Sequence, residues 1–337
     1  MSMRNKGLLS LLLVMVLLVV SGCGQQATEE PAPAPENGEA APETPPAADG
    51  GIVIGMTANN TGIDSYQTTH DEAFRAEVAR HPGVEAIILD ATGDPMLQMN
   101  QVENLIQQGV DVLVIWPVNG QAIVPAAQQA QEAGIPVIIC NSPIDESGYE
   151  FVVGFVGPDN VIQGQFAAEM MIEALGGQGR VVELTGLPGY VTATERGQGF
   201  HDGVAGSGIE IIDSQPADWN REKAQNVMEN LLTSHSDIDG VYAHDDNIAV
   251  GALNALREAG KAGEVFITSA TMFGDGYDAM KEGLIYGTVY QSPLTDAEFT
   301  VQTAIRVAQG EQVEFFNYFP TPKVTVNDID DYDRPIW

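Results

Sequence analysis

Short apolar segments alternate with longer amphipathic segments along most of this 337-residue chain. The apolar segments, such as VLVIW at 112–116 and IPVIIC at 135–140, contain almost no polar side chains. Strands that are apolar on both faces are typical of a parallel sheet covered by helices on both sides. Regular alternation of such strands with helices predicts the same α/β architecture.

The alternation occurs twice, and the residues after position 50 suffice for two cores, which predicts two α/β lobes of similar size. Strands are predicted at 51–57, 84–91, 111–116, 135–140, 151–155, 180–184, 209–214, 240–243, 265–269, 285–291 and 323–326. Helices are predicted at 66–80, 95–108, 121–133, 160–175, 194–204, 222–234, 248–259 and 295–309. The segment 276–282 completes the second lobe, and the acidic tail 328–333 is expected to be a solvated end.

Polar, glycine-rich loops follow the predicted strands between residues 181 and 253, and each loop opens a helix. Charged or aromatic residues stand in the loops or first helical turns, namely Arg196, Trp219 and Asp245. In an open α/β sheet, ligands bind outside the carboxyl ends of the strands. We therefore expect these three side chains to contact a small molecule.

The same region resembles the ribose-binding type of periplasmic sugar-binding protein, the ligand receptor of an ABC importer. The resemblance is carried by ERGQGF at 195–200, SQPADWNR at 214–221 and NVMENLLTSH at 226–235. In weaker form it covers the chain from about residue 52 to about residue 326.

This resemblance implies a type I periplasmic binding fold, in which two Rossmann-like, doubly wound parallel-sheet lobes are joined by a hinge. The chain would cross the hinge three times, near Gly157–Pro158, Gln291–Ser292 and Pro320–Thr321. The N-terminal lobe would comprise 51–157 plus 292–320, and the C-terminal lobe 158–291 plus 321–337. Ligand would bind in the cleft, and the lobes would close over it.

Two residues of the C-terminal lobe are expected, from the resemblance, to define the ligand's shape. Arg196 offers five N–H donors in a fixed fork, which suits sugar hydroxyls, although a surface ion pair is the alternative. Trp219 would pack its ring against the C–H face of a sugar, with a place in the hydrophobic core as the alternative.

Two more residues of this lobe are expected at the cleft. Asp245 would accept two hydroxyl hydrogen bonds and could pair with Arg196, or it could cap the helix that follows. Gln291 ends a predicted strand where a hinge crossing is expected, so a structural hydrogen bond at the hinge is its alternative role.

The N-terminal lobe departs from the pattern of the family. An Asp-Arg pair is usual after the fourth strand, but Asn141-Ser142 stands here, and Ala270-Thr271 replaces a Phe-Asp pair. Two adjacent phenylalanines are usual after the first strand, where this chain has Asn59, Asn60 and a single aromatic residue, Tyr66. We therefore expect Asn59, Asn60, Tyr66, Asn141, Ser142 and Thr271 to form a changed pocket, and a ligand other than ribose.

The N-terminus carries an export signal. Two basic residues precede the apolar run 7–20, which is too short to span a bilayer, and VSGC at 20–23 resembles the lipobox of bacterial lipoproteins. The resemblance implies that Cys23 is lipidated and anchors the protein to a membrane outside the cytoplasm. Residues 24–50 are rich in Pro, Ala and Glu, which predicts a disordered tether.

Several classes of function are excluded by composition. The formal net charge of −33, with 14 Lys plus Arg, argues against nucleic acid and anionic lipid surfaces as partners. With Cys23 lipidated, Cys140 has no partner for an intramolecular disulfide. The five histidines are scattered, and no G-x-S-x-G elbow is present, so we expect no metal site, no cofactor and no enzymatic activity.

We therefore expect a monomeric, lipid-anchored solute-binding protein that delivers a small sugar, polyol or cyclitol to an ABC permease by lobe closure. The alternative is a ligand receptor for a membrane signalling or chemotaxis system, or a binder of a furanone-type signal or another non-sugar metabolite.

Overall fold

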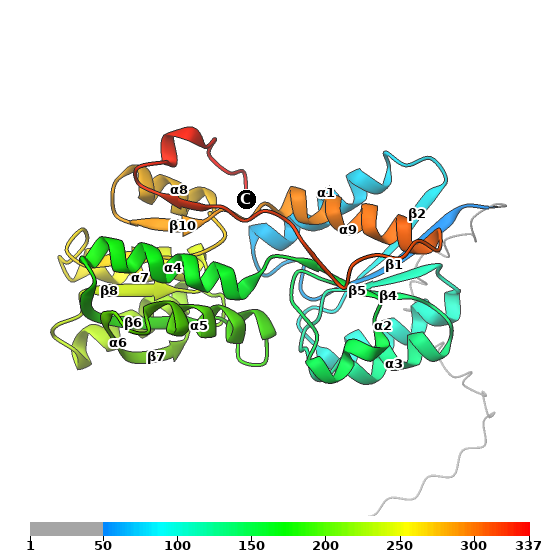
Figure 1. Ribbon diagram of the computed structural model, residues 1–337, viewed down its shortest axis with the longest axis horizontal. Coiled ribbons are helices and arrows are strands. Elements are labelled where there is room, and N and C mark those ends of the chain that lie inside the picture. Colours follow the sequence, from blue (N-terminus) through cyan, green and yellow to red (C-terminus); the bar gives the residue numbers. More distant parts are fainter. Residues whose placement is uncertain (1–49) are drawn as a thin grey trace, which may run out of the picture. The chain divides into compact units, whose positions relative to one another are not determined.

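The computed structural model describes residues 50–337, which contain two six-stranded sheets (Figure 1). The predicted lipobox at Cys23 and all of the predicted tether except Gly50 lie outside the described residues. Within residues 50–337, no helix combines the length and the apolar character that a membrane crossing requires.

The first sheet has the strand order β11-β5-β4-β3-β1-β2, and all its pairings are parallel. Its strands are β1 (Ile52–Ala58), β2 (Val84–Asp90), β3 (Val112–Ile115), β4 (Val137–Cys140), β5 (Gly154–Gly157) and β11 (Phe316–Tyr318). Its helices are α1 (Ser65–Val78), α2 (Pro95–Gln108), α3 (Val124–Glu132) and α9 (Pro293–Ala308). Helices α2 and α3 lie on one side of this sheet and α1 and α9 on the other (Figure 1).

Alternate residues of the strands face the two helical layers. Met56 and Val114 pack with Phe74 of α1 and Val301 of α9, whereas Leu113 packs with Leu105 of α2. Both faces of the strands are thus buried, as the continuous apolar segments predict.

The second sheet has the order β12-β10-β9-β8-β6-β7 and is parallel except for the antiparallel pair β10 and β12. Its strands are β6 (Gln178–Thr185), β7 (Gly208–Pro216), β8 (Gly240–Ala243), β9 (Phe266–Thr268), β10 (Gly287–Val289) and β12 (Lys323–Thr325). Its helices are α4 (Asn160–Leu175), α5 (Val191–Val204), α6 (Arg221–Ser234), α7 (Asp246–Glu258) and α8 (Gly274–Lys281).

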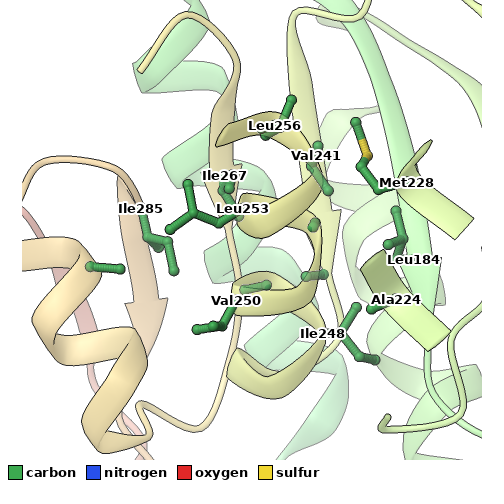
Figure 2. Packing of buried hydrophobic residues seen from close by; sticks show 14 of the residues in the cluster. Leu184, Ala224, Met228, Val241, Ile248, Val250, Leu253, Leu256, Ile267 and Ile285 are labelled. Carbon is green, nitrogen blue, oxygen red and sulfur yellow. The ribbon is translucent and has the colours of Figure 1, made fainter. Parts of the chain in front are cut away.

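Helix α7 fills the centre of the core on one face of the second sheet. Figure 2 shows Ile248 and Leu253 of α7 packed among Leu184 of β6, Val241 of β8 and Met228 of α6. The other face is covered by α4 and α5, whose Met171 and Phe200 pack on the sheet. The two α/β/α units together confirm the predicted fold class of two doubly wound, parallel-sheet lobes.

The order of strands locates the ligand-binding edge of each sheet. In the first sheet β1 lies between β2 and β3, and in the second β6 lies between β7 and β8. The chain continues from β1 to β2 on one side and from β3 to β4 on the other, so a crevice opens at the carboxyl ends of β1 and β3. The same divergence occurs at β6 and β8 in the second sheet. The loops after β1, β3, β6 and β8 therefore carry the residues of interest.

The chain passes between the two sheets in three short segments. It leaves the first sheet after Gly157, leaves the second after Val289, and passes from β11 to β12 between Tyr318 and Lys323. That the two units move as separate lobes with the predicted boundaries remains a prediction.

Element boundaries differ from the predictions in places that matter. Helix α5 begins at Val191 rather than at Thr194, so Arg196 lies in its second turn and not its first. The short strand β11 was not predicted, because its three exposed or half-buried residues carry no clear apolar pattern. Two 3-10 helices, Glu146–Phe151 and Ile329–Asp331, were also not predicted.

The acidic tail is solvated only in part, because its four Asp side chains are exposed while its apolar residues dock it to the body. Ile329 is buried in the core of the second sheet, and Asp328 accepts a hydrogen bond from Thr325 Oγ1 at 2.8 Å. The last residue, Trp337, is also buried, and its carbonyl accepts from the Gly274 amide at 2.7 Å. Apolar residues spaced among the acids therefore fix the tail to the body.

Helices α4 and α5 pack so closely that glycine is required at their crossing. A Cβ at Gly164 would lie 2.1 Å from the Arg196 carbonyl oxygen, and one at Gly199 would lie 2.0 Å from the Val161 carbonyl oxygen. Both obstacles are helix backbone, which cannot give way as a flexible side chain can. This contact fixes the distance between α4 and α5 and therefore the position of Arg196.

We expect Gly164→Ala to destabilise the protein by about 1–3 kcal/mol, because the added methyl group forces the helices apart. The matched control is Gly62→Ala, where a Cβ meets nothing within 4 Å and the change should cost less than about 0.5 kcal/mol. Urea denaturation of the two variants beside wild type measures the difference. Equal stability of both variants would mean that α4 and α5 are less tightly packed than described.

Candidate functional site

A pocket lies between the loops at the carboxyl ends of the two sheets and encloses about 440 Å³ of empty space, its mouth included. The first sheet and its connections contribute Asn59, Asp64, Tyr66, Gln67, Trp116 and Asn141. The second sheet and its connections contribute Tyr190, Thr192, Arg196, Trp219, Asp245, Thr271, Phe273 and Gln291.

Eight of the ten residues predicted to contact ligand line this pocket, namely Asn59, Tyr66, Asn141, Arg196, Trp219, Asp245, Thr271 and Gln291. The other two, Asn60 and Ser142, do not. The Asn60 side chain lies beside Gly93 instead, and the Ser142 amide donates to the Cys140 carbonyl in a tight turn at 2.7 Å. That the eight contact a ligand remains a prediction.

Six further residues line the pocket that the sequence analysis did not identify, namely Asp64, Gln67, Trp116, Tyr190, Thr192 and Phe273. Asp64 could have been found as the residue that caps the first helix after β1. Trp116 was assigned to a strand, but β3 ends at Ile115 and leaves the indole at the carboxyl edge of the sheet. The aromatic content of the first lobe is therefore higher than Tyr66 alone indicated.

The Arg196 guanidinium is only 3% exposed and is held by three hydrogen bonds. Its Nε donates to Gln163 Oε1 at 2.9 Å, one Nη to the His244 carbonyl at 2.7 Å, and the other Nη to Gln291 Oε1 at 2.9 Å. A surface ion pair is thus the wrong assignment, and no ion pair with Asp245 is formed in the described part of the chain. Two of its five N–H groups remain for a ligand.

A chain of hydrogen bonds continues from Arg196 into the first sheet. Gln291 Nε2 donates to the Tyr66 hydroxyl at 2.8 Å, and that hydroxyl donates to Asp296 Oδ2 at 3.0 Å. Asn141 Nδ2 donates to the same Asp296 oxygen at 2.6 Å. Gln291 therefore makes the structural hydrogen bond between the sheets that was its alternative role, and it also lines the pocket, where ligand contact remains a prediction.

Asp245 caps the helix that follows it, which was the alternative to ligand contact. Its Oδ1 accepts from the Ile248 amide at 2.7 Å and caps α7, while the buried carboxyl also lines the pocket. Burial, with a smaller contribution from the nearby carboxyl of Asp64, raises the pKa of Asp245 to about 7. Burial also raises the pKa of Asp64 to about 6.

A buried carboxylate supports the floor beneath Arg196. Glu183 accepts from His244 Nε2 at 3.0 Å and from Ser214 Oγ at 2.6 Å. Burial alone would raise the pKa of Glu183, but the hydrogen bonds from His244, Ser214 and His201 lower it to about 2. The charged carboxylate thereby fixes the His244 backbone that receives the Arg196 donor.

Five aromatic rings line the pocket in two groups. Tyr66 contacts Trp116 and Phe273 with ring centroids 6.3 and 6.4 Å apart, and Tyr190 contacts Trp219 edge to face at 6.3 Å. Gly186 makes room for Trp219, because a Cβ there would lie 1.9 Å from the indole ring. Trp219 also packs on the core of the second sheet, so its core and pocket roles are combined.

The backbone is strained around this pocket. Five of the six non-glycine residues with positive φ in the described chain lie in the pocket wall or beside it, namely Asn141, Asp218, Trp219, Thr271 and Met272. Thr271, at φ 82, is β-branched and thus adopts this conformation at a real cost. Such strain persists where a site must hold side chains in fixed directions.

Polar atoms of three pocket residues are buried without a hydrogen-bond partner in the protein. They are Gln67 Oε1, Thr192 Oγ1 and Trp219 Nε1. Unpaired buried atoms also occur away from the pocket, as at Thr268 and Trp337, and those in the pocket wall offer hydrogen bonds to a ligand. Metal is not indicated, because residues 50–337 contain no cluster of three or more His, Cys, Asp or Glu able to share an ion.

Comparison with known proteins identifies the family. The periplasmic binding protein domain matches residues 54–312, which is more than half of the chain.

The chain belongs to the periplasmic binding protein family.

Three relatives illustrate the family. A ribose import binding protein from Salmonella typhimurium is 36% identical over 232 residues, covering 69% of this chain and 77% of that protein. A xylitol-binding protein from Mycolicibacterium smegmatis is 31% identical over 277 residues, covering 82% of this chain and 75% of that protein. The structure of an ABC transporter solute-binding protein from Bacillus halodurans with bound myo-inositol has a TM-score of 0.80 at 30% identity, covering 85% and 99% of the two chains.

Membership confirms the resemblance seen in the sequence. The family implies an extracytoplasmic location, and the ribose and myo-inositol relatives are an import binding protein and an ABC transporter solute-binding protein. The pocket of this periplasmic binding protein lies at the switch points of two doubly wound sheets, where ligands bind in such folds.

The buried Asp296 yields a prediction about pH. Burial raises its pKa to about 7 from the usual 3.8, so between these values the folded protein binds more protons than the unfolded chain. The free energy of unfolding should therefore fall as pH rises from about 4 to about 7. Asp296→Asn keeps an acceptor for Asn141 and Tyr66 without titrating, so its stability should exceed that of wild type increasingly over this interval.

Urea denaturation of both proteins at intervals from pH 4.5 to 8 measures the effect. One carboxyl contributes at most about 1.4 kcal/mol per pH unit to the difference in slope. Parallel profiles for the two proteins would contradict the assignment of Asp296 as the carboxyl that takes up the proton.

Proposed function

We propose that this periplasmic binding protein captures a small polyhydroxylated ligand, a sugar, polyol or cyclitol, and delivers it to an ABC permease. The observation that supports this most directly is the set of unpaired polar atoms in a pocket walled by aromatic rings. Hydroxyl groups can serve both donors and acceptors, and aromatic faces can pack on the C–H face of a ring. Relatives that bind ribose, xylitol and myo-inositol favour the same ligand class.

Ribose itself fits the pocket poorly. Asn141 stands where the family usually has an acidic residue, and its amide is already bonded to Asp296 at 2.6 Å. Thr271 replaces a second acidic residue at a strained backbone position. The donors and acceptors left for a ligand thus lie mainly on Arg196, Asp245 and Asp64, an arrangement that differs from the usual pocket and favours a polyol or cyclitol.

Ligand would be captured by closure of two lobes, 51–157 plus 292–320 and 158–291 plus 321–337. In the described structure Asn59 of the first sheet already donates to the Tyr190 hydroxyl of the second at 2.9 Å. Ligand contacts with both lobes would add to this bond and shift the population toward the closed form. The closed protein would then dock on the permease.

The remaining parts of the proposal concern the residues outside the described range and the assembly. Cys23 would carry the lipid anchor, and residues 24–50 would act as a tether that lets a monomeric binding unit reach the permease. The protein would use no cofactor and catalyse no reaction.

Arg196→Lys tests this function. Lysine keeps the charge but loses the fork, so it cannot serve Gln163, Gln291, His244 and ligand together. We expect ligand affinity to fall at least tenfold, equivalent to about 1.4 kcal/mol. The matched control is Arg257→Lys, an exposed residue of the same unit paired with Glu282, which should bind as wild type does.

A thermal-shift screen of the full-length protein identifies the ligand for this test. Pentoses, hexoses, polyols, inositols, furanone-type signals and amino acids form the panel, since a ligand at a hundred times its Kd adds about 2.7 kcal/mol to stability. A response to a sugar, polyol or cyclitol supports the proposal. A response confined to furanones or amino acids would contradict the ligand class.

A further inference from the structure

Two carboxyl groups face the same pocket from opposite sheets, Asp64 on α1 and Asp245 on α7. Each caps its helix with nearly the same backbone geometry, φ −153° and ψ 174° at Asp64 against φ −150° and ψ 174° at Asp245. Asp64 Oδ1 accepts a hydrogen bond from the Gln67 amide at 2.8 Å, and Asp245 Oδ1 accepts one from the Ile248 amide at 2.7 Å. No hydrogen bond within the described residues reaches Oδ2 of either, so an acceptor on each side remains for a ligand.

The pocket supplies too little positive charge for these two carboxylates. Arg196 is the one basic residue in its wall, and all three of its hydrogen bonds go to uncharged oxygens. Two more buried carboxyls, Asp246 and Asp296, lie behind the wall. The nearest histidines, His70 and His244, do not compensate, because burial lowers the pKa of both and keeps them neutral.

Such an environment selects for a cation. Burying a carboxylate is costly unless an opposite charge accompanies it, and the raised pKa of Asp64 and of Asp245 reflects that cost. One ring of the wall already attracts a cation, since the guanidinium carbon of Arg196 lies 5.9 Å from the centroid of the Trp219 ring. Residues 50–337 contain no group of three or more His, Cys, Asp or Glu that could share a metal ion, so an organic cation fits better.

We propose that the ligand is a polyhydroxylated compound with a protonated amine, an amino sugar or aminocyclitol, whose ammonium group binds to Asp64 and Asp245. This inference rests on the proposed function and narrows it. The ammonium group donates to the free Oδ2 atoms, while the hydroxyl groups bind to Arg196 and the unpaired atoms of Thr192 and Trp219.

Paired ligands test the amine directly. Isothermal calorimetry on the full-length protein at pH 7.5 compares glucosamine with glucose, galactosamine with galactose, and amino-deoxy-inositol with myo-inositol. We expect an amine to bind at least tenfold more tightly than its alcohol in the pair that fits the pocket. Alcohols that bind as tightly as their amines would overturn this inference and leave the proposed function intact.

Variants at the two carboxyls assign the effect to these residues. Asp64→Asn and Asp245→Asn preserve the helix caps, since asparagine caps as well as aspartate, and each should reduce the amine preference at least fivefold. The control is Asp94→Asn, which replaces the cap of α2 outside the pocket and should keep the full preference. An amine preference retained in both pocket variants would overturn the assignment. Binding of neither member of any pair, with a thermal-shift response to a pentose or a polyol, would overturn this inference and leave the proposed function intact.

Discussion

The buried Arg196 guanidinium joins the parts on which the pocket depends. It lies where α5 crosses α4 at Gly164, and it bonds to Gln163 of α4, to the backbone after β8 and to Gln291 at a passage between the sheets. A guanidinium cannot release its proton under ordinary conditions, so its burial is tolerable only while these acceptors stay in place. The helix crossing, the Glu183–His244 support and the passage at Gln291 are thus parts of one arrangement.

The side chains of the pocket wall are held in place, but their hydrogen bonds and charges are not all paired. Its walls are fixed by helix caps, aromatic contacts and strained residues such as Thr271, all of which restrict side-chain movement. Its polar groups are left partly unpaired, and its negative charge exceeds its positive charge. A rigid pocket with unpaired polar atoms and uncompensated charge binds most tightly the ligand that pairs these groups without distorting the wall. This is a physical basis for ligand selectivity.

Much of this fold follows from the sequence, because buried parallel strands leave continuous apolar segments and helices α2, α4 and strand β8 have the predicted bounds. Asp245, which follows β8, was found by the same logic, whereas Arg196 lies in the second turn of α5 and was found through the family resemblance. Asp64, Trp116 and Tyr190 were missed, since nothing local separates a pocket residue from a cap, a strand end or a loop. The placement of Asn60 and Ser142 outside the pocket depends on single turns of the backbone, which spacing along the chain does not specify.

The tryptophans give the protein an optical property. The chain has three, and two of them, Trp116 and Trp219, stand in the pocket wall while the third, Trp337, is buried. Indole emission responds to the polarity and the charges around the ring, and both pocket indoles face the space that a ligand would occupy. The protein therefore carries its own label-free fluorescent reporter, and substituting Trp337 would leave the emission to the two pocket indoles alone.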